Sequence, residues 1–152
     1  MIGRAENVTG RVKDASVFRT TLKIGGRQML LVGLDRSFLI RTMGRAYLDY
    51  LPIYEGPKGL IKMDWKHQGD FLEVLNKRVG GLRFLTVDEL KNRSVKKFLG
   101  ELSAMGMDRI IAEVKETPNE KGFAVLDPKY PNAWISATED VHTCYMVFIK
   151  KS

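Results

Sequence analysis

The sequence predicts an α+β fold in which a mainly antiparallel sheet carries about three helices on one face. Three observations support this prediction. Apolar and polar residues alternate as in strands near both ends of the chain, apolar residues recur at helical spacing in the middle, and no linker divides the two patterns. The chain has 152 residues, of which 44% are hydrophobic and 28% charged. This length and composition are typical of one soluble domain, so residues 1–152 are expected to share a core.

The N-terminal region predicts a three-stranded antiparallel meander. Its strands are expected at residues 8–13, 17–24 and 28–34. In the second strand Phe18 and Leu22 face the core while Arg19 and Lys23 point outward, because successive side chains alternate between the faces of a strand. Gly25-Gly26 is a hairpin signal before the third strand. That strand is apolar at nearly every position, which indicates a central place with both faces covered.

Three helices are expected from capping residues, helical spacing and stop signals. They are a helix over residues 38–51 capped by Ser37, a helix that opens at Asp70 and ends at Gly80-Gly81, and a longer helix from Thr86 to Met105. Both later helices open with the spacing of a capping box, Asp70 with Glu73 and Thr86 with Glu89. Gly106 follows the last helix where a left-handed residue commonly closes a helix.

Shorter strands complete the expected sheet. They are predicted at residues 53–54, 60–65, 109–116, 123–126, 134–137 and 141–149. In the segment 109–116, Ile110 and Ala112 point inward, while Ile111 interrupts the polar side. A turn containing Pro118 and Gly122 joins this strand to the next as a hairpin.

Positive charge is concentrated in the first two thirds of the chain. Lys and Arg number 25 against 18 Asp and Glu, for a net charge of +7. Residues 1–100 carry 19 basic and 10 acidic side chains, whereas residues 101–152 carry 6 and 8. A cationic surface attracts polyanions such as nucleic acid and speeds their encounter. The alternative interpretation is that the charge serves solubility alone.

The first hairpin is expected to place two arginines opposite each other. A three-residue loop at 14–16 pairs Arg11 with Arg19 in the register that keeps every core residue on one face. Directly opposed like charges are unfavourable unless an anion lies between them or the side chains splay into water. A phosphate backbone is the anion that such a basic face suits. The predicted nucleic-acid-binding residues are Arg11, Lys13, Arg19, Lys23 and Arg27.

The sequence therefore favours a non-enzymatic domain that binds RNA or DNA through phosphates, and it leaves two alternatives. The first is an adaptor or inhibitor subunit that docks its basic face on an acidic protein. The second is a metal-dependent nuclease. Glu113 and Lys115 have the Glu-x-Lys spacing that many nucleases of the PD-(D/E)xK type use, because strand alternation sends both side chains to the same side. The Asp that precedes this pair in such nucleases is not evident.

Three other segments carry basic or polar residues, and each also has a structural interpretation. A basic cluster in the last predicted helix would extend the cationic surface or form the solvated side of that helix: Lys91, Arg93, Lys96 and Lys97. The segment 77–83 combines glycine with basic residues and is better explained as the end of a helix than as a phosphate loop. The loop 127–132 would bind a ligand or simply connect two strands.

Neither a cofactor nor a metal is expected. His67, His142 and Cys144 are too few for a structural zinc site, which takes four ligands. The glycine patterns of nucleotide-binding loops are absent. The longest apolar run, residues 29–34, is far shorter than the ~18 residues that span a bilayer, and the N-terminus lacks the pattern of a secretory signal. A cytoplasmic location without membrane contact is therefore expected.

Overall fold

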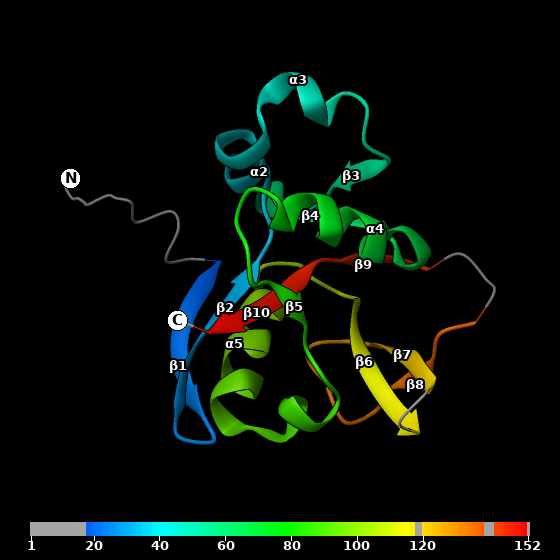
Figure 1. The fold of residues 1–152 in the computed structure, drawn as a ribbon. Helices are drawn as coiled ribbons and strands as arrows, with labels where there is room; N and C mark the ends of the chain where they lie inside the picture. Colours follow the sequence, from blue (N-terminus) through cyan, green and yellow to red (C-terminus); the bar gives the residue numbers. More distant parts are fainter. Residues whose placement is uncertain (1–17, 118–119, 139–141, 152) are drawn as a thin grey trace.

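The computed structural model describes residues 18–117, 120–138 and 142–151. Its strands are β1 (Arg19–Ile24), β2 (Arg27–Gly33), β3 (Ile53–Glu55), β4 (Ile61–Asp64), β5 (Arg83–Phe84), β6 (Ile110–Thr117), β7 (Glu120–Leu126), β8 (Ile135–Ser136), β9 (Thr143–Tyr145) and β10 (Val147–Lys151). Its helices are α2 (Arg36–Met43), α3 (Arg45–Leu48), α4 (Trp65–Asn76) and α5 (Arg93–Ala104), with short 3-10 turns η1 (Pro57–Gly59) and η2 (Asp88–Lys91). The predicted α+β class is confirmed (Figure 1).

Two mainly antiparallel sheets form the framework, where the sequence predicted one. The first sheet has the strand order β1-β2-β10-β5, and the second has the order β3-β4-β9-β6-β7-β8. Strands β6 and β9 pair in parallel. Strand β2 lies between β1 and β10, which confirms that the third predicted strand is central. The first predicted strand, residues 8–13, lies outside the described residues.

The chain passes from the second sheet to the first at Met146. This residue joins β9 to β10, and its N–H donates to the C=O of Ile61 at 3.3 Å. Its own C=O accepts the N–H of Leu34 at 2.9 Å. The described part of the predicted strand 141–149 is thus divided between the two sheets as β9 and β10, and Met146 between them holds the ends of β2 and β4 together.

Helices cover both faces of the first sheet. One face packs against α5 and carries Leu22, Met29, Leu31, Val147 and Ile149. The opposite face packs against α2 and α4 and carries Leu30, Val32 and Phe148. The expectation that all helices share one face therefore does not hold. The reason lies in β2, whose apolar residues on both faces each need a cover.

The first predicted helix, 38–51, is divided at Gly44. Asp35 rather than Ser37 caps α2, because the Asp35 Oδ1 accepts the N–H of Phe38 at 3.0 Å. Gly44 has a φ of 90° in the left-handed region, so α2 ends at Met43 and the short α3 follows.

The second predicted helix begins at Trp65 rather than Asp70, and Asp70 lies inside it. Gln68 accounts for the difference. It is fully buried, and its Nε2 donates to the C=O of Met63 at 3.1 Å and to the C=O of Cys144 at 2.8 Å. A hydrogen-bonded polar residue therefore completes the buried face of α4, which apolar spacing alone leaves incomplete.

The predicted capping box of the third helix is confirmed, although the helix is not continuous. The N–H of Thr86 donates to the Glu89 Oε1 at 2.9 Å, and the N–H of Glu89 donates to the Thr86 Oγ1 at 3.2 Å. This box opens only the short η2. Asn92 then caps α5, because its Oδ1 accepts the N–H of Ser94 at 2.8 Å and that of Val95 at 3.1 Å.

Gly106 follows α5 with a φ of 108°, as predicted for the residue that closes this helix. A Cβ at this position would lie 2.8 Å from the Cγ of Pro57, so the approach of η1 also requires glycine. None of the helices formed by the described residues has the length and apolar character that crossing a bilayer demands.

Candidate functional site

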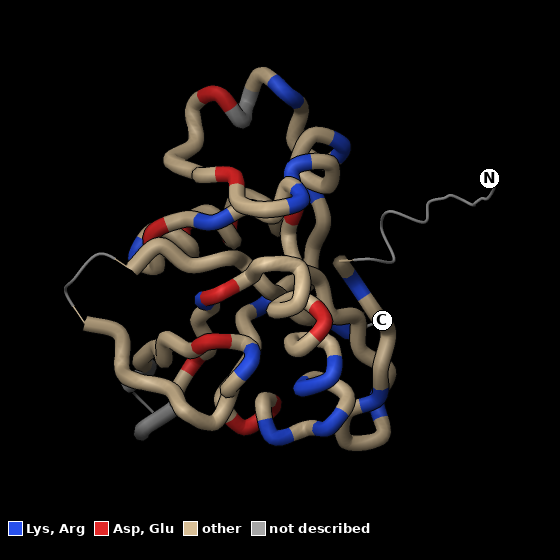
Figure 2. Tube along the Cα trace, turned by 180° about the vertical axis from the view of Figure 1, so that it is seen from behind, with Lys and Arg blue, Asp and Glu red and all other residues tan. Residues whose placement is uncertain are grey.

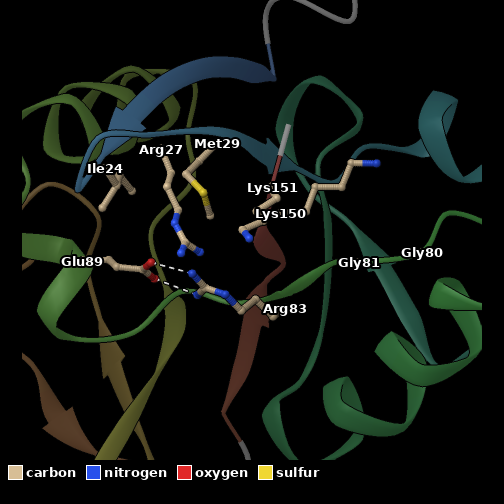
Figure 3. A pocket seen from close by; sticks show the side chains of 9 residues that line it. All are labelled: Ile24, Arg27, Met29, Gly80, Gly81, Arg83, Glu89, Lys150 and Lys151. Carbon is tan, nitrogen blue, oxygen red and sulfur yellow. Dashed lines mark hydrogen bonds and ion pairs between the residues drawn. The ribbon is translucent and has the colours of Figure 1, made fainter.

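A hollow of about 530 Å³ lies where the β1–β2 hairpin, the end of β10 and the loop before β5 meet (Figure 3). Four cationic side chains line it with one carboxylate, two apolar side chains and two glycines. They are Arg27, Arg83, Lys150, Lys151, Glu89, Ile24, Met29, Gly80 and Gly81. This hollow is called the basic pocket below.

Strand pairing brings three of these cations to one face of the first sheet. Lys151 of β10 pairs with Met29, which is two residues from Arg27 on β2. Ile149, two residues before Lys151, pairs with Arg83 of β5. Lys151 is therefore diagonal to both arginines, and diagonal neighbours in a sheet lie about 7–8 Å apart. Figure 3 shows both arginines pointing into the pocket.

Arg83 is fixed by a bidentate pair with Glu89. Its Nη1 donates to the Glu89 Oε1 at 2.9 Å and its Nη2 donates to the Oε2 at 2.7 Å. Nη1 also donates to the C=O of Phe84 at 3.0 Å. A guanidinium has five N–H donors. Within the described part of the chain, the Nε–H and one Nη2–H of Arg83 make no hydrogen bond, so both are available to a ligand. Arg83 is thus oriented before any ligand arrives.

Both members of this pair keep their charge at neutral pH. Burial alone would raise the pKa of Glu89, but the hydrogen bonds from Arg83 and from the Thr86 N–H outweigh it and hold that pKa below its ordinary value. The hydrogen bond to Glu89 raises the pKa of Arg83. The one carboxylate of the pocket is therefore committed to Arg83.

The other three cations have no such partner. Among the residues that the structure describes, no carboxylate pairs with Arg27, Lys150 or Lys151. Like charges gathered without counter-charges repel one another, and an anion in the pocket would relieve this repulsion. The pocket therefore has the electrostatics of an anion-binding site.

A glycine turn forms the wall of the pocket beside β10. Gly80 and Gly81 have φ of 81° and 78°, a conformation that L side chains rarely adopt. Asn76 fixes the turn, because its Nδ2 donates to the C=O of Leu82 at 2.8 Å and its Oδ1 accepts the Leu82 N–H at 2.9 Å. A Cβ on Gly81 would lie 3.9 Å from the Lys150 side chain, which runs directly over the turn. Helix α4 ends at Asn76, so these glycines reverse the chain after the helix.

The structure divides the predicted basic ribbon. Arg19 and Lys23 share the outward face of β1, as predicted. Arg27 lies on the opposite face, because the Gly25-Gly26 turn pairs it directly with Ile24. It therefore belongs to the basic pocket and not to the surface of Arg19 and Lys23. Two predicted members lie outside the described residues: Arg11 and Lys13.

The second basic cluster occupies η2 and the start of α5. Lys91 lies 3.8 Å from Asp88, and both side chains are exposed. Lys96 lines a separate groove together with the loop 127–132. Figure 2 shows Lys and Arg segments gathered at the end of the molecule where η2, the start of α5 and the β1–β2 hairpin lie. The cluster thus extends the basic surface beyond the basic pocket.

Glu113 and Lys115 both lie on β6, as the predicted strand required. The backbone of Glu113 is engaged on the side away from β7: its N–H donates to the C=O of Leu85 at 2.7 Å, and its C=O accepts the N–H of Val87 at 3.0 Å. The side chain of Glu113 is half-buried, and that of Lys115 lies outside the described residues. The nuclease hypothesis stays a prediction.

Cys144 is a buried residue of β9. Burial raises the pKa of its thiol from 9.0 to about 12, so the thiol stays protonated at neutral pH, and its Sγ donates to the C=O of His142 at 3.6 Å. His67 lies on α4 with its Nδ1 3.8 Å from the Asp64 Oδ2. Within the described ranges, no three His, Cys, Asp or Glu side chains gather as metal ligands.

Sequence reasoning missed three members of the basic pocket: Arg83, Lys150 and Lys151. The two lysines follow the predicted strand 141–149 directly. Extending that strand by two residues puts Lys151 on the face of Ile149, and this signal was present in the sequence. Arg83 belongs to the segment 77–83, which combines glycine with basic residues but was interpreted as the end of a helix. Its place in the pocket depends on a strand of two residues that pairs with the end of the chain.

Comparisons of this chain with protein-family models, with curated proteins and with solved structures find no match. The function of this chain is therefore inferred from the site itself.

Proposed function

We propose that this protein binds nucleic acid without catalysis, mainly through the phosphates, and that the basic pocket is the principal contact. The observation that carries the proposal is the convergence of Arg27 and Lys151 on a pre-oriented Arg83, with Lys150 at the rim of the hollow and one carboxylate already paired. Phosphate contacts by Lys and Arg dominate the affinity of proteins for nucleic acid.

The donors of the pocket match a phosphate diester. Guanidinium groups present their N–H donors in a planar fork that suits phosphate oxygens, whereas lysine ammonium groups act as point charges. Arg27 is exposed, and Arg83 offers its remaining donors from a fixed position. Ile24 and Met29 add apolar surface to the same hollow, against which a sugar can pack. One phosphate and its neighbouring sugar are therefore a suitable occupant.

Charge reversal tests the proposal. Arg27→Glu with Lys151→Glu is expected to weaken binding of labelled single-stranded DNA, RNA and duplex DNA by at least about tenfold in fluorescence anisotropy, because two phosphate contacts become repulsive. Neither residue is part of the buried core, so the melting temperature should change little. The matched control, Arg45→Glu with Lys58→Glu, reverses two exposed cations elsewhere. It changes the net charge by the same amount as the pocket variant.

Three outcomes separate the alternatives. Loss of binding in the pocket variant but not in the control supports the proposal. Equal loss in both variants means that net charge alone drives binding, and no binding by the wild type removes the proposal in favour of an acidic protein partner. The predicted outer face is tested in the same assay with Arg19→Glu and Lys23→Glu, and Mg²⁺-dependent or Mn²⁺-dependent cleavage would favour the nuclease hypothesis at Glu113.

A further inference from the structure

A second hollow, also of about 530 Å³, lies between α5 and the loop 127–133. Lys96 and Gly100 line it from α5, and Lys129, Tyr130 and Pro131 line it from the loop. Its lining combines two cations with an aromatic ring and apolar surface from proline. This combination differs from the basic pocket, where the described residues supply no aromatic side chain. It is called the tyrosine groove below.

The loop holds Tyr130 in a fixed backbone conformation. The Asp127 Oδ1 accepts the N–H of Lys129 at 2.8 Å, and the Asp127 C=O accepts the N–H of Tyr130 at 2.8 Å. The C=O of Tyr130 in turn accepts the N–H of Ala133 at 3.0 Å. Despite these anchors, Tyr130 is 59% exposed. A ring that is presented to solvent by an ordered loop loses little conformational entropy when a ligand stacks on it.

One cation lies over this ring, and a second lines the same groove. The Lys129 Nζ lies 5.6 Å from the centroid of the Tyr130 ring, and Lys96 lines the same groove. Proteins that bind single-stranded nucleic acid combine these two elements, an aromatic platform for a base and positive charge for the backbone. Tyr50 is even more exposed, at 87%, but it follows α3 on a different part of the chain.

The tyrosine groove and the basic pocket are close enough for one strand to reach both. Glu89 lines the basic pocket and Lys96 lines the groove, and seven residues of chain span at most about 25 Å. A nucleic-acid strand stacked as in a duplex, at 3.4 Å per nucleotide, covers that distance with about eight nucleotides. Lys91 and Arg93 lie between the two hollows along the chain and are exposed.

We propose that the tyrosine groove stacks an unpaired base on Tyr130, so that the nucleic acid bound by this protein is single-stranded. This inference rests on the proposed function of the basic pocket. Bases in a duplex already stack on one another and turn only their edges outward, so a protein ring can stack on a base only when that base is unpaired. The tyrosine groove would therefore distinguish single strands from duplexes, whereas the basic pocket would bind phosphates of both.

The test compares a labelled single strand of about 12 nucleotides with the duplex of the same sequence, by fluorescence anisotropy. Tyr130→Ala is expected to weaken binding of the single strand by about tenfold and to leave the duplex within about twofold, because stacking on one aromatic ring accounts for about this factor. Tyr130→Phe keeps the ring and should bind like the wild type. Tyr50→Ala is the matched control, since it removes an exposed tyrosine elsewhere and should change neither affinity.

The outcomes also separate this inference from the proposed function. If Tyr130→Ala binds the single strand like the wild type, or weakens both forms equally, the stacking site is wrong. In that case a loss of binding in Arg27→Glu with Lys151→Glu would still support the basic pocket. If the wild type binds neither form, both proposals are wrong. A loss of single-strand binding in Tyr130→Phe would also contradict stacking, because the ring is still present.

Discussion

The basic pocket and the apolar groove beside α4 are hollows of opposite chemistry on the same framework. The apolar groove has a volume of about 220 Å³ and is lined by Leu51, Pro52, Met63, His67, Asp70, Phe71 and Val74. Two of these residues belong to the core, since Met63 is 1% exposed and Phe71 is 4% exposed. The cations of the basic pocket contribute nothing to that core. The groove is thus the outer side of residues that fold the protein, whereas Arg27, Lys150 and Lys151 of the pocket are side chains that the core does not use.

This difference separates stability from binding. Strand pairing places Arg27 and Lys151 near each other although their charges repel, and the core would form equally well with neutral residues at both positions. A cost that folding does not require is typical of a functional site. Substitutions in the two hollows should therefore have different effects on stability and on binding, and the following predictions test this in order of decreasing effect.

The largest effect is expected in the apolar groove. Phe71→Ala should lower the free energy of unfolding by about 3–5 kcal/mol, because it leaves a cavity in the core that packs α4 against the first sheet. Nucleic-acid affinity of the folded fraction should not change. Urea unfolding and fluorescence anisotropy, measured on one preparation, check both statements. If the folded fraction of Phe71→Ala binds nucleic acid more weakly than the wild type, the apolar groove also contributes to binding and the separation of the two hollows is wrong.

A smaller effect is expected from Glu89→Gln in the basic pocket. The Glu89 side chain is 13% exposed and pairs with Arg83, so this change should cost about 1–2 kcal/mol of stability at neutral pH. Removing the one carboxylate should also tighten nucleic-acid binding. Phe71→Ala would thus lower stability without changing affinity, whereas Glu89→Gln would lower stability and raise affinity.

The pH dependence of Glu89→Gln has a defined sign. The pKa of Glu89 is lower in the folded protein than its ordinary 4.5, so its stabilisation is complete above that value and is lost as the pH falls through the folded pKa. The stability difference between wild type and Glu89→Gln should therefore shrink in urea unfolding as the pH is lowered below 4.5. A difference that is independent of pH would show that packing, and not charge, connects Glu89 to Arg83.

The smallest effects are expected at two glycines. Gly81→Ala in the wall of the basic pocket should cost about 1 kcal/mol, because its φ of 78° strains any L side chain. Gly69→Ala, inside α4 with no atom beyond its chain neighbours and the helix backbone within 4 Å of the added Cβ, should instead stabilise the protein by about 0.5–1 kcal/mol. Thermal unfolding measures both. If Gly81→Ala stabilised the protein as Gly69→Ala is expected to do, the backbone of the turn at Gly81 would have changed conformation to relieve the strain.

Much of the fold follows from local pattern in the sequence. The strict alternation in β1, the apolar run of β2 and the Thr86–Glu89 capping box all report local rules, and the structure confirms each of them. The predictions that were wrong concern features that depend on residues distant in the sequence. Gln68 is polar, and nothing near it in sequence shows that the C=O of Cys144 lies within hydrogen-bond distance of its side chain.

The candidate site was predictable only in part for the same reason. Arg27 was recognised as basic and close to a turn, but its face depends on the register of a two-glycine hairpin. Arg83 becomes part of the site only because β5 pairs with β10, whose partner residue Ile149 is distant in sequence. Charge composition predicted a basic surface, and only the pairing of strands determines which cations line the basic pocket.

The salt dependence of nucleic-acid affinity tests most directly whether the basic pocket contacts phosphates. For the wild type, the logarithm of affinity should fall with the logarithm of salt concentration at a slope of about −3 to −5. In Arg27→Ala with Lys151→Ala the slope should be shallower by about 1.4–1.8, since each lost contact removes about 0.7–0.9. An unchanged slope in this variant, or no binding by the wild type at low salt, would contradict the proposed site.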